Sequence, residues 1–454
     1  MNNVTDVLIV GAGLSGLRAA QLIQQAGLSA NVLEARDRVG GRMLSRRLED
    51  GTTIDLGAQW INPYQKRMYA LVQRYNLKMI ERHTKGDSIV GFGKHFQRMS
   101  GTTPPISLIS KLDLLQISWR IDRMAHQMSV TEPWQYRLAE QLDSISFDVW
   151  LEKNTFTKEA RAYWRYVVEA GTCASCEQFS ALEVMHQIAT IGGLKELENA
   201  DYAFLAEGVG AIAQNMADEL GDIVHLSVPV RSLLYDGQLV RAITDKGEFS
   251  GKRVILALPP QLLAKISFDG GLADSLARRL PEGYASRSQN IVLGQIIKHV
   301  VVYERAWWRD LGLNGSADTP KEPIEFMADS SNDAGSPGVL VAFSSATHAT
   351  SLSQIDEESR KSIVLTHIQK ILGKAPVPVK HFNSMDWISE PWSCGGYGSR
   401  RAIGGWIDRQ NPNTPCDPIH FAGTETATEW RSYMEGALQS AERASAEIID
   451  VLNR

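Results

Sequence analysis

Cysteine is scarce in this sequence, with four residues among 454. Two of them, Cys173 and Cys176, have C-x-x-C spacing, but no second pair follows at the distance that a zinc site requires. The sequence therefore predicts no metal site. A redox pair at this position stays an alternative. We favour two buried free thiols, since so few cysteines are typical of a reducing compartment.

Long hydrophobic runs and a strong charge excess are also lacking. The first apolar run ends at Gly11, too early for a signal peptide or a membrane span, and no basic segment precedes it. The formal net charge is −5, and no block of lysine and arginine would attract nucleic acid or anionic lipid. We therefore expect a cytoplasmic protein whose partners include neither nucleic acid nor a membrane.

The first fifty residues carry the strongest local pattern. Residues 7–10 form a short apolar run typical of a buried parallel strand, and Gly11-Ala-Gly13-Leu-Ser-Gly16 follows directly. A helical pattern comes next, and then a second apolar strand that ends at Glu34. This order predicts a dinucleotide-binding unit, in which the glycines admit the diphosphate and the acid accepts from the ribose hydroxyls. Since an acid here disfavours a 2′-phosphate, we expect NAD or FAD rather than NADP.

Two further segments decide between these cofactors. Gly40-Gly41-Arg42 follows the acid, and Asp55 and Trp60 come next in the stretch "DLGAQW". With these residues the chain resembles the flavin-containing amine oxidases, in which a V-G-G-R segment adds contacts to the FAD diphosphate. An arginine after two glycines can reach a diphosphate without obstruction by its own backbone. A basic surface turn is the alternative for this arginine-rich stretch, and the resemblance favours FAD.

The resemblance also assigns the cofactor site. Val230 is the expected adenine contact, and Glu425 is expected to bind ribitol or diphosphate groups. The residues that we expect to bind FAD are Gly11, Gly13, Leu14, Ser15, Gly16, Glu34, Ala35, Arg36, Gly41, Arg42, Gly57, Ala58, Gln59, Trp60, Val230, Trp387, Gly423, Thr424, Glu425, Tyr433 and Met434.

The middle of the chain predicts a second domain. Helical patterns dominate from about residue 63 to 201, with Ser146 as a candidate helix cap, and strand patterns return after that. We predict an α/β (α+β) fold. A Rossmann-like FAD-binding domain of the amine oxidase (glutathione-reductase-like) type would interleave with a substrate domain made of a β-sheet and a helical lobe. The expected ranges are 1–75, 205–285 and 380–454 for the FAD-binding domain, and 76–204 and 286–379 for the substrate-binding domain.

Lys298 stands within a mostly apolar strand pattern that runs from Ile291 to Val302. By composition alone, an exposed strand face with this lysine in water is the preferred interpretation. The resemblance reverses that preference, because the family keeps a lysine here that binds a water beside flavin N5 and is linked to reoxidation by oxygen. A buried ammonium would also stabilise negative charge on the flavin or on superoxide. We therefore expect Lys298 to be catalytic.

The C-terminal segment "HFAGTETATEWRSYMEGA" closely resembles the corresponding family motif. Tyr433 in this segment and Tyr397 in "SCGGYGS" fall on the two positions between which the amine passes in monoamine oxidases. The resemblance implies that both are catalytic and contact the substrate, since two aromatic faces attract an amine. Mammalian monoamine oxidases attach their flavin through a cysteine directly before the first tyrosine. Gly396 stands there, and Cys394 lies two residues earlier, so we expect non-covalent FAD.

These features together predict an FAD-dependent amine oxidase. The amine carbon would give a hydride equivalent to the flavin, the imine would hydrolyse to an aldehyde, and O2 would reoxidise the flavin with release of hydrogen peroxide. A di- or polyamine such as putrescine or spermidine is favoured over a monoamine, with Glu325 and Phe326 as further substrate contacts. The expected partners are the amine and O2, and the sequence leaves a homodimer open.

Three other functions stay open. An L-amino acid oxidase on the same fold would need an arginine for the substrate carboxylate, and Arg431, beside Tyr433, is the candidate. An amine dehydrogenase would pass its electrons to an acceptor other than oxygen. A non-catalytic flavin-binding protein is disfavoured by the presence of Lys298, Tyr397 and Tyr433.

Overall fold

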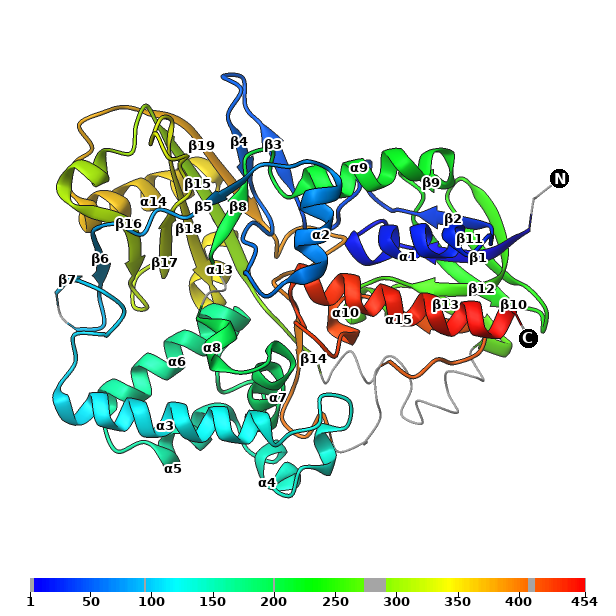
Figure 1. Cartoon of the computed structure of the whole chain (residues 1–454), viewed down its shortest axis with the longest axis horizontal. Helices are drawn as coiled ribbons and strands as arrows, with labels where there is room; N and C mark the ends of the chain where they lie inside the picture. Colours follow the sequence, from blue (N-terminus) through cyan, green and yellow to red (C-terminus); the bar gives the residue numbers. More distant parts are fainter. Residues whose placement is uncertain (1–3, 94, 199–200, 273–290, 407–412, 454) are drawn as a thin grey trace.

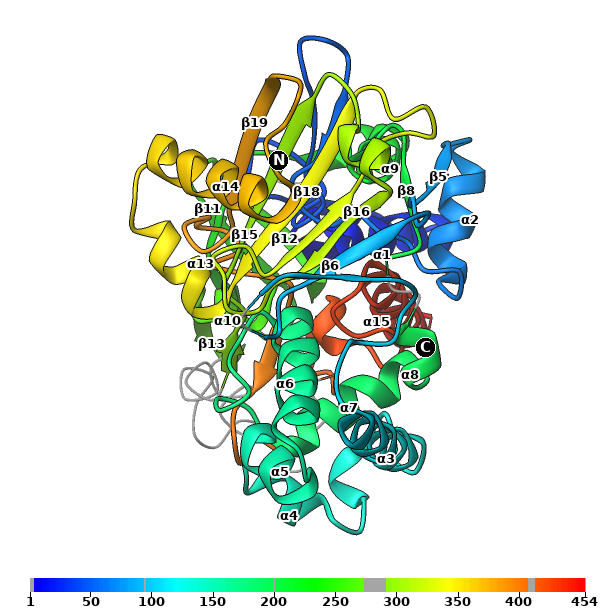
Figure 2. The same ribbon diagram turned by 90° about the vertical axis from the view of Figure 1, so that its left-hand side faces the viewer.

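The computed structural model describes residues 4–93, 95–198, 201–272, 291–406 and 413–453. Figure 1 shows two sheets and a helical lobe: the first sheet lies on the right, the second on the upper left, and the lobe below the second. Figure 2 shows the same lobe beneath the second sheet when the molecule is turned by 90°. These three bodies confirm the predicted α/β (α+β) class.

The first sheet is built around β1 (Thr5–Val10), the apolar run that opens the sequence. It pairs in parallel with β2 (Ala30–Leu33), and α1 (Leu14–Gln25) connects the two strands as predicted. The order of the described strands is β13 (Ser267–Gly270), β10 (Val230–Tyr235), β11 (Val240–Thr244), β12 (Gly247–Leu256), β1, β2 and β9 (Val224–His225), with β21 (Ile419–Phe421) also paired to β12.

Helices from distant parts of the sequence cover one face of this sheet. The C-terminal helix α15 (Met434–Leu452) packs along α1, and α9 (Gly210–Leu220) packs on the other side of α1. Their apolar side chains form one buried cluster with those of β1 and β2, including Leu17, Ile212 and Leu438. The two ends of the chain are therefore held side by side by a shared core (Figure 1).

The second sheet holds the predicted strand around Lys298. The order of the described strands is β19 (Val379–Asp386), β15 (Ile296–Tyr303), β18 (Gly338–Ser345), β17 (Phe326–Asp329), β16 (Leu313–Asp318), β6 (Asp87–Val90) and β7 (Gln97–Met99). Every residue of β15 and β18 is buried. In β15, Val301 packs in the same cluster as residues of α14 (Glu357–Leu372), whereas Ile296 and Val300 pack in a cluster with Trp387 on the opposite face.

This arrangement explains why the composition-based interpretation of Lys298 is wrong. β15 lies between β18 and β19, and the cluster with α14 and the cluster with Trp387 cover its two faces, so neither face meets solvent. Because strand side chains alternate between faces, Lys298 shares the face of Ile296 and Val300. Its side chain is 2% exposed.

The helical lobe confirms the prediction that helices dominate the middle of the chain. Side-chain oxygens cap several of its helices, and Ser146 accepts from the Val149 amide as predicted. The described lobe helices are α3 (Leu108–His126), η1 (Pro133–Gln135), α4 (Ala139–Asp143), α5 (Phe147–Asn154), α6 (Lys158–Thr172), α7 (Ala181–Ile191) and α8 (Leu194–Leu197).

Shorter elements connect these three bodies. Small strand pairs are β3 (Ser45–Arg47) with β4 (Thr53–Asp55), β5 (Met79–Glu81) with β8 (Ala203–Leu205), and β14 (Ile291–Leu293) with β20 (Ser399–Arg401). The remaining described helices are α2 (Lys66–Arg74), η2 (Gly221–Ile223), α10 (Pro260–Leu263), η3 (Trp307–Leu311), α13 (Ala346–Ser353) and η4 (Thr424–Thr426).

The domain ranges stay a prediction. The boundary expected between residues 285 and 286 lies outside the described residues. β19, which falls almost entirely in the range assigned to the FAD-binding domain, pairs with β15 in the second sheet. Across the described parts of the chain, no helix is long and apolar enough to cross a membrane. No group of three histidine, cysteine or acidic residues able to hold a metal ion occurs within those parts either.

A buried ion pair joins the lobe to the C-terminal segment. Glu183 of α7 accepts from the Arg431 guanidinium and from Trp406 Nε1, and the side chains of the pair are 0% and 5% exposed. Substitution Glu183→Gln leaves the arginine charge uncompensated, so we expect the free energy of unfolding to fall by about 3 kcal/mol or more. Chemical denaturation of the FAD-loaded protein measures this change.

The matched control is Glu152→Gln, which removes an exposed partner of Arg161. Because water screens exposed pairs, this change should cost less than about 1 kcal/mol. Equal losses in the two variants would contradict a structural role for the buried pair.

Candidate active site

The glycine-rich turn after β1 forms one end of the site. Gly11 has a φ of +103°, and a Cβ atom there would lie 2.8 Å from the Ala257 carbonyl oxygen, so only glycine fits. The turn leads into α1, whose first backbone N–H groups have no partner within the helix and can bind phosphate. This geometry is the one expected from the pattern Gly11-Ala-Gly13-Leu-Ser-Gly16 in a dinucleotide-binding unit.

Glu34 follows β2 and is 3% exposed. One carboxylate oxygen accepts from the Ala12 amide at 2.7 Å, and the other accepts from the Arg36 amide at 2.9 Å. These bonds hold the carboxylate at the rim of the glycine turn. Each oxygen keeps a further acceptor direction for a ribose hydroxyl.

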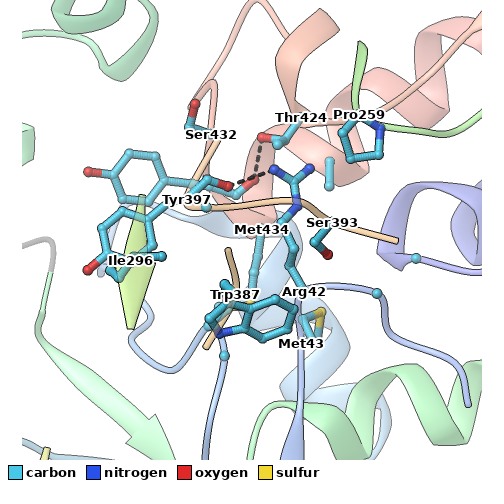
Figure 3. Close-up of a pocket in the computed structure, with 18 of the residues that line it drawn as sticks. Arg42, Met43, Pro259, Ile296, Trp387, Ser393, Tyr397, Thr424, Ser432 and Met434 are labelled. Atoms are coloured by element: carbon cyan, nitrogen blue, oxygen red, sulfur yellow. Dashed lines mark hydrogen bonds between the residues drawn. The ribbon is translucent and has the colours of Figure 1, made fainter. Parts of the chain in front are cut away.

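Arg42 joins three distant segments in the middle of the site. Its Nη1 donates to Glu425 Oε1 at 2.6 Å and to the Tyr397 carbonyl oxygen at 2.6 Å, and its Nη2 donates to Glu425 Oε2 at 3.1 Å. Figure 3 shows the arginine side chain passing Trp387 and reaching the backbone of Tyr397. Although burial raises the pKa of Glu425, the Arg42 guanidinium lowers it below its ordinary value. The pair is therefore ionised.

Trp387 and Gly57 pack together against the cavity. Trp387 Nε1 donates to the Leu56 carbonyl oxygen at 2.9 Å, which fixes the indole against the turn after β4. A Cβ atom on Gly57 would meet the Arg42 carbonyl oxygen at 2.0 Å and the indole at 3.0 Å. The glycine in "DLGAQW" is thus required by close packing.

One cavity of about 680 Å³ connects these features. It runs from the glycine turn and Val230, past Arg42 and Trp387, to a chamber lined by the lobe and the second sheet. All predicted site residues line it except Gly16 and Glu425. Gly16 packs on the Gly11 carbonyl within α1, and Glu425 lies behind Arg42 and binds its guanidinium.

Lys298 lies where the turn after β4 meets the second sheet. Its Nζ donates to Gln59 Oε1 at 2.7 Å and to the Gly57 carbonyl oxygen at 2.9 Å. Burial lowers the pKa of Lys298 to about 7, opposed by the carboxylates of Asp55 and Asp201. Burial likewise raises the pKa of Asp55 to about 6. The ammonium is therefore held next to the cavity, and its charge is sensitive to pH near neutrality.

Tyr397 and Tyr433 both line the cavity, and neighbouring rings support each of them. Tyr397 has an edge contact with Phe343 at 6.4 Å between ring centroids, and Tyr433 has one with Trp430 at 5.1 Å. Burial raises the pKa of both phenols, so both rings stay neutral. Tyr397 keeps 38% of its surface exposed. That the two rings form an aromatic cage around the substrate amine stays a prediction.

Three carboxyl groups line the chamber. Glu325 Oε2 accepts from the Ser345 amide at 3.1 Å and from the Ser345 hydroxyl, and its side chain is 14% exposed. Asp318 accepts from the Tyr166 hydroxyl at 2.5 Å, and Asp201 also lines the chamber. Burial raises the pKa of all three carboxyl groups, in the case of Glu325 to about 7.

Glu325 and Phe326, predicted from the sequence as substrate contacts, line the cavity, and so do Asp318, Asp201 and Tyr166, which the sequence did not single out. Asp318 ends β16, and Glu325 directly precedes β17, the strand that pairs with β16; Thr319 N donates to the Glu325 carbonyl oxygen at 2.8 Å. An acidic residue at the end of a strand pattern does not by itself indicate a substrate site. Only the pairing of β16 with β17 brings Asp318 and Glu325 into one chamber.

Arg431 does not line the cavity. Its guanidinium is bound to Glu183, and its Nε donates to Gln187 Oε1 at 3.2 Å. The role that the L-amino acid oxidase alternative gives to Arg431 is therefore wrong for this structure, because the side chain is already neutralised by a buried carboxylate.

The residues of the cavity fit FAD. The glycine turn and Arg42 supply donors for a diphosphate, Glu34 supplies an acceptor for a ribose, and Val230 lies at the end expected for adenine. Gly396 precedes Tyr397, so no thiol stands at the attachment position of the covalent enzymes. Cys394 Sγ instead contacts Lys265 Nζ at 3.3 Å and the Pro391 carbonyl oxygen at 3.4 Å.

Comparisons with known proteins agree with this assignment. The profile of the family described as "Flavin containing amine oxidoreductase" matches residues 14–449. Putrescine oxidase from Kocuria rosea is 31% identical over 464 residues, which cover 98% of this chain and 95% of the relative. An L-amino acid dehydrogenase from Synechocystis sp. is 30% identical over 457 residues, with coverage of 98% and 95%. A solved structure of putrescine oxidase bound to putrescine has a TM-score of 0.91 at 32% identity, with 100% of both chains covered.

The chain therefore belongs to the flavin-containing amine oxidoreductase family. It is an FAD-dependent oxidoreductase that acts on amines, and its fold is that of the flavin amine oxidases.

The lowered pKa of Lys298 provides a test of the role that we expect for this residue in reoxidation of the flavin by O2. The ammonium is charged below a pH of about 7 and neutral above it, and only the charged form stabilises negative charge that develops on oxygen. We expect the rate constant for reoxidation of the reduced enzyme by O2 to fall as pH rises through this value. Stopped-flow mixing of reduced enzyme with oxygenated buffer measures it.

Lys298→Met should lower that rate constant by about 100-fold and remove its pH dependence. The control is Lys252→Met, since Lys252 is exposed and pairs with Asp6 far from the cavity. A rate constant that rises with pH in the unmodified enzyme would contradict the role.

Proposed function

We propose that the substrate is a dication, a diamine or polyamine such as putrescine, whose reacting amine lies between Tyr397 and Tyr433. The acidic chamber carries this proposal, because Glu325, Asp318 and Asp201 line it together. A second ammonium placed there would meet carboxylates, whereas an alkyl chain that ends without charge would leave them without a cation. The likeness to a putrescine oxidase supports the same substrate class.

Glu325 is the acid that we expect to hold the distal ammonium. Its two bonds from Ser345 occupy Oε2, and Oε1 is left toward His348 at 4.0 Å. Burial raises its pKa to about 7, so a cation bound beside it would favour the ionised form. Phe326 and Phe343, whose rings stack at 5.8 Å, supply an apolar wall for the alkyl chain.

The chain's own residues then orient the reacting carbon. FAD, when bound, accepts the hydride equivalent from the carbon next to the amine. The neutral phenol rings attract the amine, and the apolar wall favours its uncharged form, which can release electrons to the flavin. The imine that leaves the site hydrolyses to an aldehyde. We propose O2 as the acceptor that Lys298 serves.

The other candidates differ from this proposal in measurable ways. An amine dehydrogenase would be reduced by amines but reoxidised slowly by O2, and the relative from Synechocystis sp. bears the name of a dehydrogenase. A non-catalytic protein would bind FAD and stay oxidised with every amine. The cytoplasmic location and the homodimer stay predictions from the sequence.

Putrescine and butylamine form a matched pair, because they differ only in the distal amine. We expect anaerobic flavin reduction to be at least about 10-fold more efficient with putrescine, since a charged hydrogen bond to a buried acid contributes about 1.5–3 kcal/mol. Glu325→Gln should remove most of this preference. Stopped-flow bleaching of the visible flavin band gives the rate constants.

Equal efficiencies for the two amines in the unmodified enzyme would sink the dication proposal and leave the family assignment intact. The control is Glu322→Gln, since Glu322 belongs to the same strand connection but pairs with Lys370 outside the cavity. It should preserve the preference for putrescine.

The same pair of amines gives a pH test. The pKa of Glu325 is raised to about 7, so its carboxyl group is neutral below this value and ionised above it. The preference for putrescine over butylamine should therefore grow as pH rises through about 7, and Glu325→Gln should flatten this rise. The efficiency ratio measured across that range checks the sign, because effects on the reacting amine are common to both substrates.

A further inference from the structure

Gln59 makes side-chain contacts that its expected place beside the cofactor does not explain. It lies in the turn after β4, lines the cavity and is 5% exposed. Its side-chain amide joins Lys298 to Ser330: Oε1 accepts from Lys298 Nζ at 2.7 Å, and Nε2 donates to Ser330 Oγ at 2.7 Å. Both polar groups of this amide therefore bind protein side chains.

Ser330 fixes which end of the amide faces the lysine. It follows β17, is 8% exposed, and its N–H donates to the Val339 carbonyl oxygen at 2.8 Å. An ammonium and an amide nitrogen are both donors, so an amide turned by 180° would place donor against donor. With Nε2 of Gln59 bound to the Ser330 hydroxyl, Oε1 is directed toward Lys298.

Neutral acceptors hold the ammonium of Lys298. Nζ donates to Gln59 and to the Gly57 carbonyl oxygen at 2.9 Å, and it forms no ion pair with a described residue. Asp55 and Asp201 act on it through their charges at longer range. Hydrogen bonds from the charged form favour that form, so the Gln59 carbonyl group opposes the burial that disfavours the ammonium.

The remaining surroundings of Nζ leave one donor for the cavity. The ring centroids of Trp60 and Phe343 lie 5.6 Å and 5.4 Å from Nζ, distances at which a ring face attracts a cation. An ammonium has three N–H groups, and two of them bind Gly57 and Gln59. Since Lys298 lines the cavity, its third N–H group can act there.

We propose that Gln59, oriented by Ser330, is a positioning residue that holds Lys298 in its ammonium form and directs the third N–H group into the cavity. This inference rests on the proposed function, because the reaction with O2 is the step that needs the charge. Two buried neutral side chains thereby set the pH range in which the lysine acts. No bond forms or breaks at either of them.

The pH profile of reoxidation by O2 tests this assignment. In Gln59→Leu the ammonium loses a hydrogen bond to its charged form, so the pKa of Lys298 falls. The decline of the rate constant with rising pH should then occur at a pH lower by about one unit. Well below both midpoints the two rate constants should converge, because the lysine is charged in both proteins. A structural defect would instead lower the rate constant at every pH.

The absorption spectrum of the oxidised, FAD-loaded enzyme gives a second readout that needs no turnover. A charge that appears beside the cofactor shifts the visible flavin band, and loss of the transition in Lys298→Met assigns it to this lysine. The midpoint should fall by about one unit in Gln59→Leu. It should rise in Gln59→Glu, because a carboxylate would pair with the ammonium.

Ser330→Ala removes the acceptor of Nε2 and should move both midpoints in the same direction as Gln59→Leu, by a smaller amount. The control is Gln214→Leu, since Gln214 is exposed and binds Asp218. It should leave both midpoints unchanged. If Gln59→Leu fails to retain FAD, Ser330→Ala decides, because Ser330 does not line the cavity.

Equal midpoints in Gln59→Leu and the unmodified enzyme would overturn the proposal, and so would the absence of a transition that depends on Lys298 in both readouts. A different result would test the proposed function alone. If Lys298→Met were reoxidised as fast as the unmodified enzyme, the role of Lys298 toward O2 would fail. The spectral midpoints would then still decide whether Gln59 controls its charge.

Discussion

The ion pair between Arg42 and Glu425 is the interaction on which the rest of this site depends. It joins two residues that are 383 positions apart, and the same guanidinium holds the Tyr397 carbonyl oxygen. The Gly40-Gly41-Arg42 turn, the C-terminal motif and the segment of Tyr397 are thereby fixed to one another. Glu425 lies behind Arg42, whereas Arg42 lines the cavity. The guanidinium is therefore positioned to bind the cofactor diphosphate.

The charged groups in and around the cavity divide into paired groups that hold the structure together and a group that faces the chamber without a charged partner. Ionised groups that hold the structure together are paired, as in Glu183 with Arg431. Glu325, which faces the chamber, is left with neutral or distant partners. Burial shifts the pKa of Glu325 toward the neutral form, which is the cost of keeping it unpaired. A cation bound beside Glu325 would relieve that cost, and this is a physical basis for selecting one amine among many.

Local patterns were sufficient for the nucleotide-binding half of the molecule. The strand, the glycine turn, the helix and Glu34 are contiguous, so periodicity and spacing locate them, and the structure confirms the order β1, α1, β2. The burial of Lys298 could not be inferred in this way, because it depends on distant segments, including that of Trp387, that cover its face of β15. The same limit applies to Asp318, and to Glu425, whose partner is Arg42. The misassignment of Arg431 has a similar cause, since its proximity to Tyr433 in sequence says nothing about Glu183.

The most direct test of this account is a double-mutant cycle on FAD affinity with Arg42→Met, Glu425→Gln and the two combined. If the pair acts as one unit, each single substitution should weaken FAD binding strongly, and the second should add little to the first. The coupling free energy, obtained from the four dissociation constants of FAD, should then be about 2 kcal/mol or more. Additive losses would contradict the account, because Arg42 and Glu425 would then contribute to FAD binding independently.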